Sequence, residues 1–251
     1  MFELSCVLSE LFWPYLALLL LCFIYVRYAA VNRFLRCTTR QTVLFVTSHP
    51  DDECMFFAPT LLSLLREGHS VHLVCLSKGD FYGQGDVRKK ELMASCGKLG
   101  IPVSNVSIID DEALKDGPDN DWSISAVADR VLGVVNRVNA DTVITFDESG
   151  VSGHSNHVAL FRGVRTLIGD KKLNTTSVFA LESTNLVRKY TSLLDIPVSS
   201  IFNYWTFVCS PTDVIKAWRS MAAHSSQFVW FRKLYIVFSR YMFVNTLREL
   251  K

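Results

Sequence analysis

Short apolar runs alternate with amphipathic stretches along most of the chain after residue 40. The apolar runs, rich in β-branched side chains, predict strands at Val43–Thr47, Val71–Leu76, Val106–Ile109, Asp141–Phe146 and, later, Phe202–Val208. Helical spacing of apolar residues predicts helices at Cys54–Arg66, Val87–Leu99, Ser123–Val138 and Thr212–Ala223. Successive strand–helix units with continuously apolar strands predict an α/β fold, a Rossmann-like, doubly wound and mostly parallel sheet.

Polar residues cluster directly after two of these strands. His49–Glu53 follows the first strand, and Asp147–His157 follows the fourth. In doubly wound sheets ligands bind beyond the carboxyl ends of the strands. We therefore expect the two clusters to form one site.

The N-terminal segment contains the apolar run Leu11–Val26, which carries no charged residue. A cleaved signal peptide, a buried core helix and a membrane anchor are the three interpretations. Glu3 and Glu10 precede the run and argue against a signal peptide, and leucines on every face from Leu18 to Leu21 argue against a core helix. We therefore expect residues 1–40 to be a single-pass anchor with a basic flank, and residues 41–251 to be the catalytic domain.

Positive charge after the run orients that anchor. Four arginines and no acidic residue follow it, at Arg27, Arg33, Arg36 and Arg40. The positive-inside rule then predicts that the catalytic domain faces the cytosol.

Composition narrows the class of protein. The chain has 251 residues, 49% of them apolar, and its 26 basic and 24 acidic residues give a net charge of +2. These values exclude a largely disordered chain and argue against a nucleic-acid-binding protein that works through bulk charge. The 7 cysteines form no Cys-x-x-Cys pair, which fits a reducing compartment rather than a disulfide framework.

The first polar cluster places an imidazole beside two carboxylates. His49 and one aspartate can bind a common metal, while the other of Asp51 and Asp52 points toward a water molecule. Alternatively, Asp51, Asp52 and Glu53 complement the N-terminus of the helix that starts near Cys54. That alternative explains the acidic residues but not the position of His49 at a strand end.

The second cluster contains a His-x-x-His spacing, His154 and His157. In the first turn of a helix this spacing puts both imidazoles on one face. One of them can complete a His/Asp/His site for a divalent metal that leaves positions open for water and substrate, as catalytic zinc requires. The other can act as an electrophile or proton donor near the metal.

A nucleotide-binding site and a site for covalent acyl-enzyme chemistry are both disfavoured. The loop with Gly79, Gly83 and Gly85 has neither the P-loop nor the dinucleotide-binding order, and no Gly-x-Ser-x-Gly elbow is present. The glycine loop either brings backbone amides and Arg88 to a polar ligand or is an ordinary connection.

Several segments together carry a family resemblance. They are SHPDDE at 48–53, SKGDFYGQGDVRKKEL at 77–92, DDEALKDG at 110–117, TFDESGVSGHSNH at 145–157 and HSSQFVWFRKLYIVFSRYM at 224–242. Over about residues 41–245 the chain resembles the zinc-dependent de-N-acetylases, a family that includes bacterial LmbE-like and mycothiol-pathway deacetylases. It is most similar to the branch that acts on phosphatidylinositol-linked N-acetylglucosamine.

The resemblance implies a role for each clustered residue. It makes His49, Asp52 and His157 the ligands of a divalent metal, with zinc as the expected ion, and Asp51 the general base. His154 matches the position that stabilises the oxyanion or protonates the departing amine.

The resemblance also implies that Arg88 and Asp116 bind the substrate. Two departures stand out. Asn156 occupies the place where many bacterial members have a carboxylate beside the second histidine, and Ser152 occupies the place of a tyrosine in the mycothiol branch.

The implied activity is metal-dependent hydrolysis of the N-acetyl group of a lipid-linked sugar, an early step of GPI-anchor biosynthesis at the endoplasmic reticulum membrane. One alternative is a membrane-tethered deacetylase of a soluble N-acetyl sugar, and another is a non-enzymatic lipid- or glycan-binding protein. The sequence identifies no protein partner. Gln227–Val244, rich in aromatic and basic residues, is either a helix packed on the domain or a segment at the membrane interface.

Overall fold

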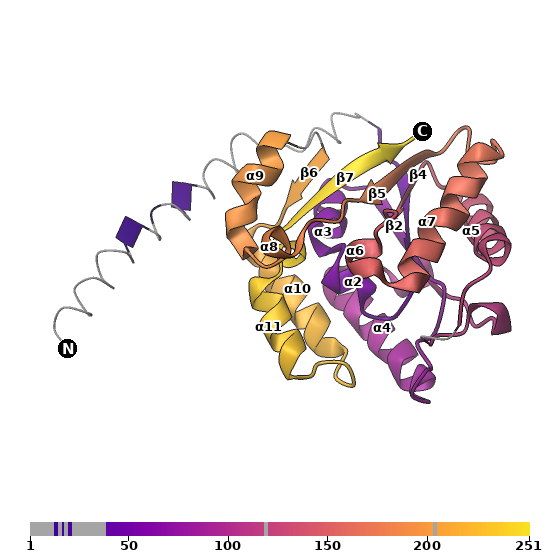
Figure 1. The fold of residues 1–251 in the computed structure, drawn as a ribbon, viewed down its shortest axis with the longest axis horizontal. Helices are drawn as coiled ribbons and strands as arrows, with labels where there is room; N and C mark the ends of the chain where they lie inside the picture. The colour runs from indigo at the N-terminus through magenta and orange to yellow at the C-terminus, as the bar shows by residue number, and fades with distance from the viewer. Residues whose placement is uncertain (1–12, 15–16, 18–19, 22–38, 118–119, 203–204) are drawn as a thin grey trace.

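The computed structural model describes residues 39–117, 120–202 and 205–251, together with residues 13, 14, 17, 20 and 21. Within these ranges one sheet has the strand order β3-β2-β1-β4-β5-β7-β6 (Figure 1). The strands are β1 (Thr42–Thr47), β2 (Ser70–Cys75), β3 (Val106–Ile108), β4 (Thr142–Phe146), β5 (Ser177–Leu181), β6 (Trp205–Val208) and β7 (Val244–Leu250). β1 to β5 pair in parallel, whereas β7 lies antiparallel between β5 and β6.

Helices cover both faces of the sheet. α5 packs on α7 over one face, while α3, α4 and α10 pack together over the other (Figure 1). The longer helices are α3 (Ala58–Arg66), α4 (Gly85–Leu99), α5 (Ile124–Val138), α7 (Ser155–Gly169), α9 (Asp195–Phe202), α10 (Pro211–Ala223) and α11 (Trp230–Phe238). Single turns are α2 (Asp52–Met55), α6 (Gly150–Gly153), α8 (Leu186–Lys189), η2 (Val103–Asn105), η3 (Glu112–Leu114), η4 (Ser192–Leu194) and η5 (Arg240–Met242). The α/β, mostly parallel fold is confirmed.

Most of the predicted elements are present, with one correction. The helix expected at Cys54–Arg66 is two helices, α2 and α3, which are separated at Phe56 and Phe57. Pro59 lies in the first turn of α3, where its missing N–H costs no hydrogen bond, so a new helix starts there. β5 and β7 were not predicted from the sequence.

The expected anchor, Leu11–Val26, lies mostly outside the described residues. Among the residues that the structure does describe, no helix combines the length and the apolar character needed to cross a bilayer. The boundary between an anchor and a catalytic domain near residue 40 stays a prediction.

A buried ion pair joins three helices beneath the carboxyl edge of the sheet. Glu53 of α2 and His224, which follows α10, are both fully buried, and Glu53 Oε1 lies 2.8 Å from His224 Nε2. Burial alone would lower the pKa of His224, but the charge and hydrogen bond of Glu53, together with the charges of Asp51 and Glu91, raise that pKa above its ordinary value. Ser95 of α4 donates a hydrogen bond to the same Glu53 oxygen. The pair therefore fixes α2 against α4 and α10.

Replacing His224 with alanine is expected to destabilise the fold by about 3–5 kcal/mol, because Glu53 stays buried without its cation. Denaturant unfolding followed by circular dichroism measures this loss. The control is His72→Ala, which removes a half-buried imidazole that contacts the Ser70 hydroxyl and should cost under about 1 kcal/mol. Equal losses of unfolding free energy in the two variants would show that the Glu53–His224 pair contributes no more to stability than the contact of His72.

Candidate active site

The two polar clusters meet at the point where the strand order changes direction. β1 and β4 are neighbours in the sheet, and the chain leaves β1 toward β2 on one side while β4 and β5 continue on the other. A crevice forms outside the carboxyl ends of the strands at such a switch point. His49 lies in the loop after β1, and His154 and His157 lie at the start of α7, the second helix after β4. The structure thus brings the two clusters together as the sequence predicts.

The loop after β1 has an unusual backbone. Asp51 has a φ of 122°, which L-residues rarely adopt and which costs on the order of 1–3 kcal/mol. Its amide donates to Glu53 Oε2 at 3.0 Å, while Asp52 Oδ2 accepts from the amides of Ser48 and His49, both at 2.9 Å. These bonds hold the turn and leave Asp52 Oδ1 facing the cavity residues.

Three imidazoles and a carboxylate converge there. Ligand nitrogens of His49, His154 and His157 all lie within 4.8 Å of one another. Asp52 Oδ1 lies 3.3 Å from His157 Nε2, and Asp52 Oδ2 lies 4.0 Å from His49 Nδ1. All four residues line one cavity of about 200 Å³.

His157 is held in a defined tautomer. Its Nδ1 donates to the Gly150 carbonyl at 3.1 Å, and its ring stacks on Phe146 at a centroid distance of 3.8 Å. Gly150 has a positive φ, and a Cβ there would come within 2.8 Å of the His157 Cβ, so glycine is required. His157 Nε2 is buried without a hydrogen bond and faces a carboxylate. A bare nitrogen lone pair opposite a carboxylate oxygen is the arrangement that a divalent cation satisfies.

His49 lies in a strongly negative environment. Its Nε2 is 3.2 Å from Asp116 Oδ1 and 3.0 Å from Asn156 Nδ2. Burial lowers the pKa of His49, but the hydrogen bond that His49 donates to Asp116, together with the charges of Asp52, Asp116 and Asp51, raises that pKa above its ordinary value. The field that favours a proton on His49 equally favours a metal cation.

His154 is at the rim of the cavity and is the exposed member of the three imidazoles. Its ring is nevertheless partly desolvated, and this partial burial, followed by the nearby His157 and His49, lowers the pKa of His154 to about 4. Its Nδ1 accepts from the Asn156 amide at 3.3 Å. A neutral His154 with Nδ1 as acceptor carries its proton on Nε2, which is therefore available as a hydrogen-bond donor.

Arg88 is buried and binds two loops together. It donates to the Pro50 carbonyl at 2.8 Å and to the Gly79 carbonyl at 3.0 Å. A Cβ at Gly79, where φ is 69°, would come within 2.4 Å of the guanidinium. Arg88 also lies 3.7 Å from both Asp51 Oδ2 and Asp116 Oδ2. It lines the cavity, as expected for a substrate contact, but two of its donors are already engaged.

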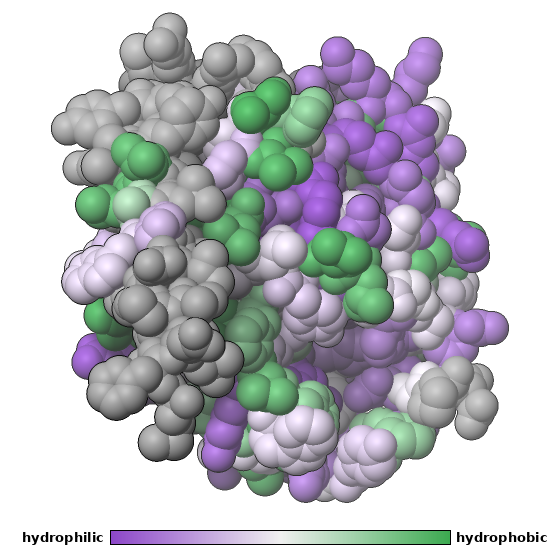
Figure 2. Space-filling view, turned by 60° about the vertical axis from the view of Figure 1, so that its left-hand side comes forward, coloured by the Kyte–Doolittle hydropathy of each residue, from purple (hydrophilic) through white to green (hydrophobic). Residues whose placement is uncertain are grey.

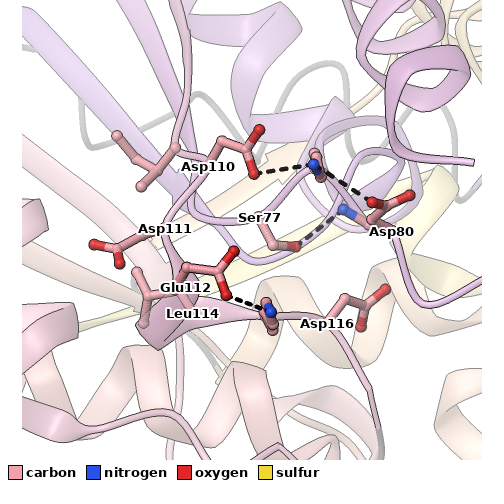
Figure 3. Close-up of a pocket in the computed structure, with 11 residues that line it drawn as sticks. Ser77, Asp80, Asp110, Asp111, Glu112, Leu114 and Asp116 are labelled. Atoms are coloured by element: carbon pink, nitrogen blue, oxygen red, sulfur yellow. Dashed lines mark hydrogen bonds and ion pairs between the residues drawn. The ribbon is translucent and has the colours of Figure 1, made fainter. Parts of the chain in front are cut away.

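A second, polar pocket adjoins the cavity at Asp116. It has a volume of about 350 Å³ and lies between the glycine loop after β2 and the acidic segment after β3 (Figure 3). Lys78 crosses it, with Nζ 3.2 Å from Asp110 Oδ1 and 3.4 Å from Asp80 Oδ2. The glycine loop thus borders a polar space next to the cavity.

The two departures from the family pattern have structural counterparts. Asn156 is fully buried and directs its amide to His49, so the support of His157 comes from the Gly150 carbonyl instead of a side-chain carboxylate. Ser152 lines the cavity where the other branch has a tyrosine.

Arg232 was missed by the analysis of the sequence. It lies on α11, and its Nη1 is 2.8 Å from Asp51 Oδ2. The only signal was its place in the segment 224–242, because its approach to Asp51 depends on how α11 packs against α2. The Tyr235 hydroxyl makes that contact by donating to the Met55 carbonyl at 3.1 Å.

The comparisons with known proteins identify the family of this chain. The family model described as "PIG-L: GlcNAc-PI de-N-acetylase" matches residues 44–168. N-acetylglucosaminyl-phosphatidylinositol de-N-acetylase of Bos taurus is 51% identical over 209 residues, which are 82% of this chain and 83% of the relative. The Saccharomyces cerevisiae enzyme of the same name is 27% identical over 80% of this chain and 78% of its own.

Solved structures share the fold at lower sequence identity. N,N'-diacetylchitobiose deacetylase from Pyrococcus horikoshii superposes with a TM-score of 0.61 at 15% identity, covering 91% of each chain. A deacetylase of teicoplanin biosynthesis has a TM-score of 0.59 at 14% identity, covering 84% of this chain and 99% of that one. From the extent of the sequence match to the Bos taurus enzyme, together with the family model, the chain belongs to the GlcNAc-PI de-N-acetylase family.

Proposed function

We propose that the protein is a metal-dependent amide hydrolase that removes the N-acetyl group of N-acetylglucosaminyl-phosphatidylinositol, releasing acetate and glucosaminyl-phosphatidylinositol. Family membership supports the substrate. The convergence of His49, Asp52 and His157 beside Asp51 is the observation that carries the chemistry. We propose the endoplasmic reticulum membrane as the location from the family resemblance, and a cytosolic catalytic domain from the positive charge after Leu11–Val26.

His49, Asp52 and His157 are the residues that would hold the cation, with zinc as the expected ion. The bare Nε2 of His157 opposite Asp52 and the negative field at His49 both fit a bound divalent ion. When bound, such an ion supplies Lewis-acid polarisation of the acetamide carbonyl and makes water easier to deprotonate at neutral pH.

The side chains around the cation site would move the protons. Asp51 takes a proton from the attacking water as its oxygen adds to the acetamide carbon. His154 donates its Nε2 proton in a hydrogen bond to the developing oxyanion, and one such donor commonly contributes about 3 kcal/mol. The C–N bond then breaks, the amine nitrogen takes the proton held on Asp51, and acetate leaves. Arg88 and Asp116, which line the same cavity beside Asp51 and His49, would orient sugar hydroxyls.

An exposed apolar face supports a lipid-linked substrate. Hydrophobic side chains gather on the side of the molecule that carries α8, α9 and α11 (Figure 2). The most exposed are Leu186, Val187, Ile201, Phe202 and Trp230, each at least 67% exposed. α11 also buries Tyr235 against α2, so this helix both packs on the domain and presents aromatic side chains outward. Such a face suits the interfacial region of a bilayer.

Acetate release from N-acetylglucosaminyl-phosphatidylinositol tests the proposal directly. The Asp51→Asn variant should lose about 100- to 10,000-fold in turnover, because the base is gone, while its metal content stays that of the wild type. Asp86→Asn, which alters a solvent-exposed carboxylate on α4, is the matched control and should keep full activity. No acetate from fully metallated wild type would overturn the assigned substrate. A soluble N-acetyl sugar would then be assayed next.

Zinc should stabilise protein that has first been stripped with a chelator. At a free zinc concentration 100 times the dissociation constant, binding adds about 2.7 kcal/mol, which corresponds to a rise of roughly 5–10 °C in Tm for a domain of this size. Scanning calorimetry measures the shift. His157→Ala should abolish it, whereas His69→Ala, which removes a histidine next to β2, should not. A full shift in the His157 variant would contradict the assigned ligands.

A further inference from the structure

An apolar groove borders the catalytic cavity on the side of α11. It has a volume of about 700 Å³, and its walls include Tyr190, Trp230, Leu234 and Phe238. The groove and the cavity share four wall residues, Met55, Phe56, Ser152 and Arg232. A ligand with a polar head and apolar chains can therefore occupy both spaces at once.

Arg232 is the cation at the boundary of the two spaces. Of the described lysines and arginines, Lys189 lines the groove and Arg88 lines the cavity, but Arg232 lines both. Its side chain is 20% exposed, so solvent or a ligand can reach it.

The partner of Arg232 is exchangeable. Asp51 Oδ2 lies 2.8 Å from the Arg232 guanidinium, yet this oxygen has no donor with hydrogen-bond geometry. Arg88, by contrast, donates to two backbone carbonyls that fix its position. Arg232 instead contacts two side chains, Asp51 Oδ2 and Met55 Sδ, and is thus the arginine of the site that a ligand anion can draw away from its present contacts.

The proposed substrate has a matching order of chemical groups. A neutral sugar and inositol are followed by a phosphodiester and then by two acyl chains. When the sugar lies in the polar cavity and the chains lie in the apolar groove, the phosphodiester falls at the boundary. A guanidinium binds phosphate oxygens through two parallel N–H donors.

We propose that Arg232 binds the phosphodiester of the lipid-linked sugar and exchanges its contact with Asp51 for that phosphate when the substrate arrives. This inference rests on the proposed function. The exchange has two effects: it anchors the substrate, and it frees the Asp51 oxygen to receive the proton of the attacking water. Phosphate in the substrate then raises kcat as well as lowering KM.

The test compares a substrate that carries the phosphodiester and acyl chains with one that carries neither. One is N-acetylglucosaminyl-phosphatidylinositol in detergent micelles, and the other is N-acetylglucosaminyl-inositol, which lacks phosphate and acyl chains. Arg232→Gln should lower kcat/KM on the lipid-linked substrate by about 10- to 100-fold, the range for a lost charged hydrogen bond. On the phosphate-free substrate its kcat should equal or exceed that of wild type, because Asp51 no longer has to release an arginine.

Two further variants separate the proposed role from others. Lys233→Gln removes the same charge from the neighbouring, exposed position of α11 and should change kcat/KM by less than about 3-fold. Arg232→Lys keeps the charge but not the two parallel donors, so it should fall between wild type and Arg232→Gln. Zinc stabilisation in calorimetry verifies that each variant is folded and retains its metal site.

Three results would overturn the inference. The first is an equal loss on both substrates for Arg232→Gln, which would mean that Arg232 only positions Asp51. The second is no loss on either substrate. The third is a loss in Lys233→Gln as large as that in Arg232→Gln, which would mean general attraction to the micelle surface. In all three, wild-type activity leaves the proposed function intact, whereas inactivity of metallated wild type on both substrates overturns the function itself.

Discussion

The backbone of Asp51 is the constraint on which the rest of the site depends. Its positive φ lets one short turn present His49, Asp51 and Asp52 to the same cavity, and L-residues do not adopt that conformation unaided. The Asp51 amide is held by the carboxylate of Glu53, which in turn is held by His224 and Ser95. A buried ion pair seldom adds much stability in itself. Here the Glu53–His224 pair holds the turn at Asp51 in place through contacts with α4 and α10, at residues that take no part in the chemistry.

Charge balance explains how so many ionisable groups share so small a space. Asp51, Asp52 and Asp116 are each mostly buried, and each lies within 4 Å of a histidine or an arginine. Carboxylates in such a setting need cations to offset the loss of hydration. Arg88 and Arg232 bring positive charge to Asp51, while His49 lies beside Asp116 and His157 beside Asp52. The three mostly buried carboxylates are thus balanced by both arginine and histidine side chains.

The sequence alone predicted that the two polar clusters meet, because each follows a strongly apolar strand. Position at a strand end is a local property, and β1 and β4 were both evident as short apolar runs. Glu53–His224 and Asp51–Arg232 could not be predicted in this way. The first pair spans 171 positions along the chain, and both form only after α10 and α11 pack against α2. β7 escaped notice because its residues Val244–Leu250 (VNTLREL) mix polar and apolar side chains without a continuous apolar run, although the strand lies between β5 and β6.

The hydrolytic residues and the residues that border the apolar groove on α11 lie in different parts of the chain. The family model spans residues 44–168, which hold the seven residues expected in the site and the parallel strands β1 to β4. α11, which carries Arg232, comes later in the chain, between β6 and β7, and contributes Trp230, Leu234 and Phe238 to the wall of the apolar groove. Mutations in this later part can reshape what is recognised while the hydrolytic residues stay fixed. Such a division would let one deacetylase fold evolve to bind different substrates while its hydrolytic residues stay the same.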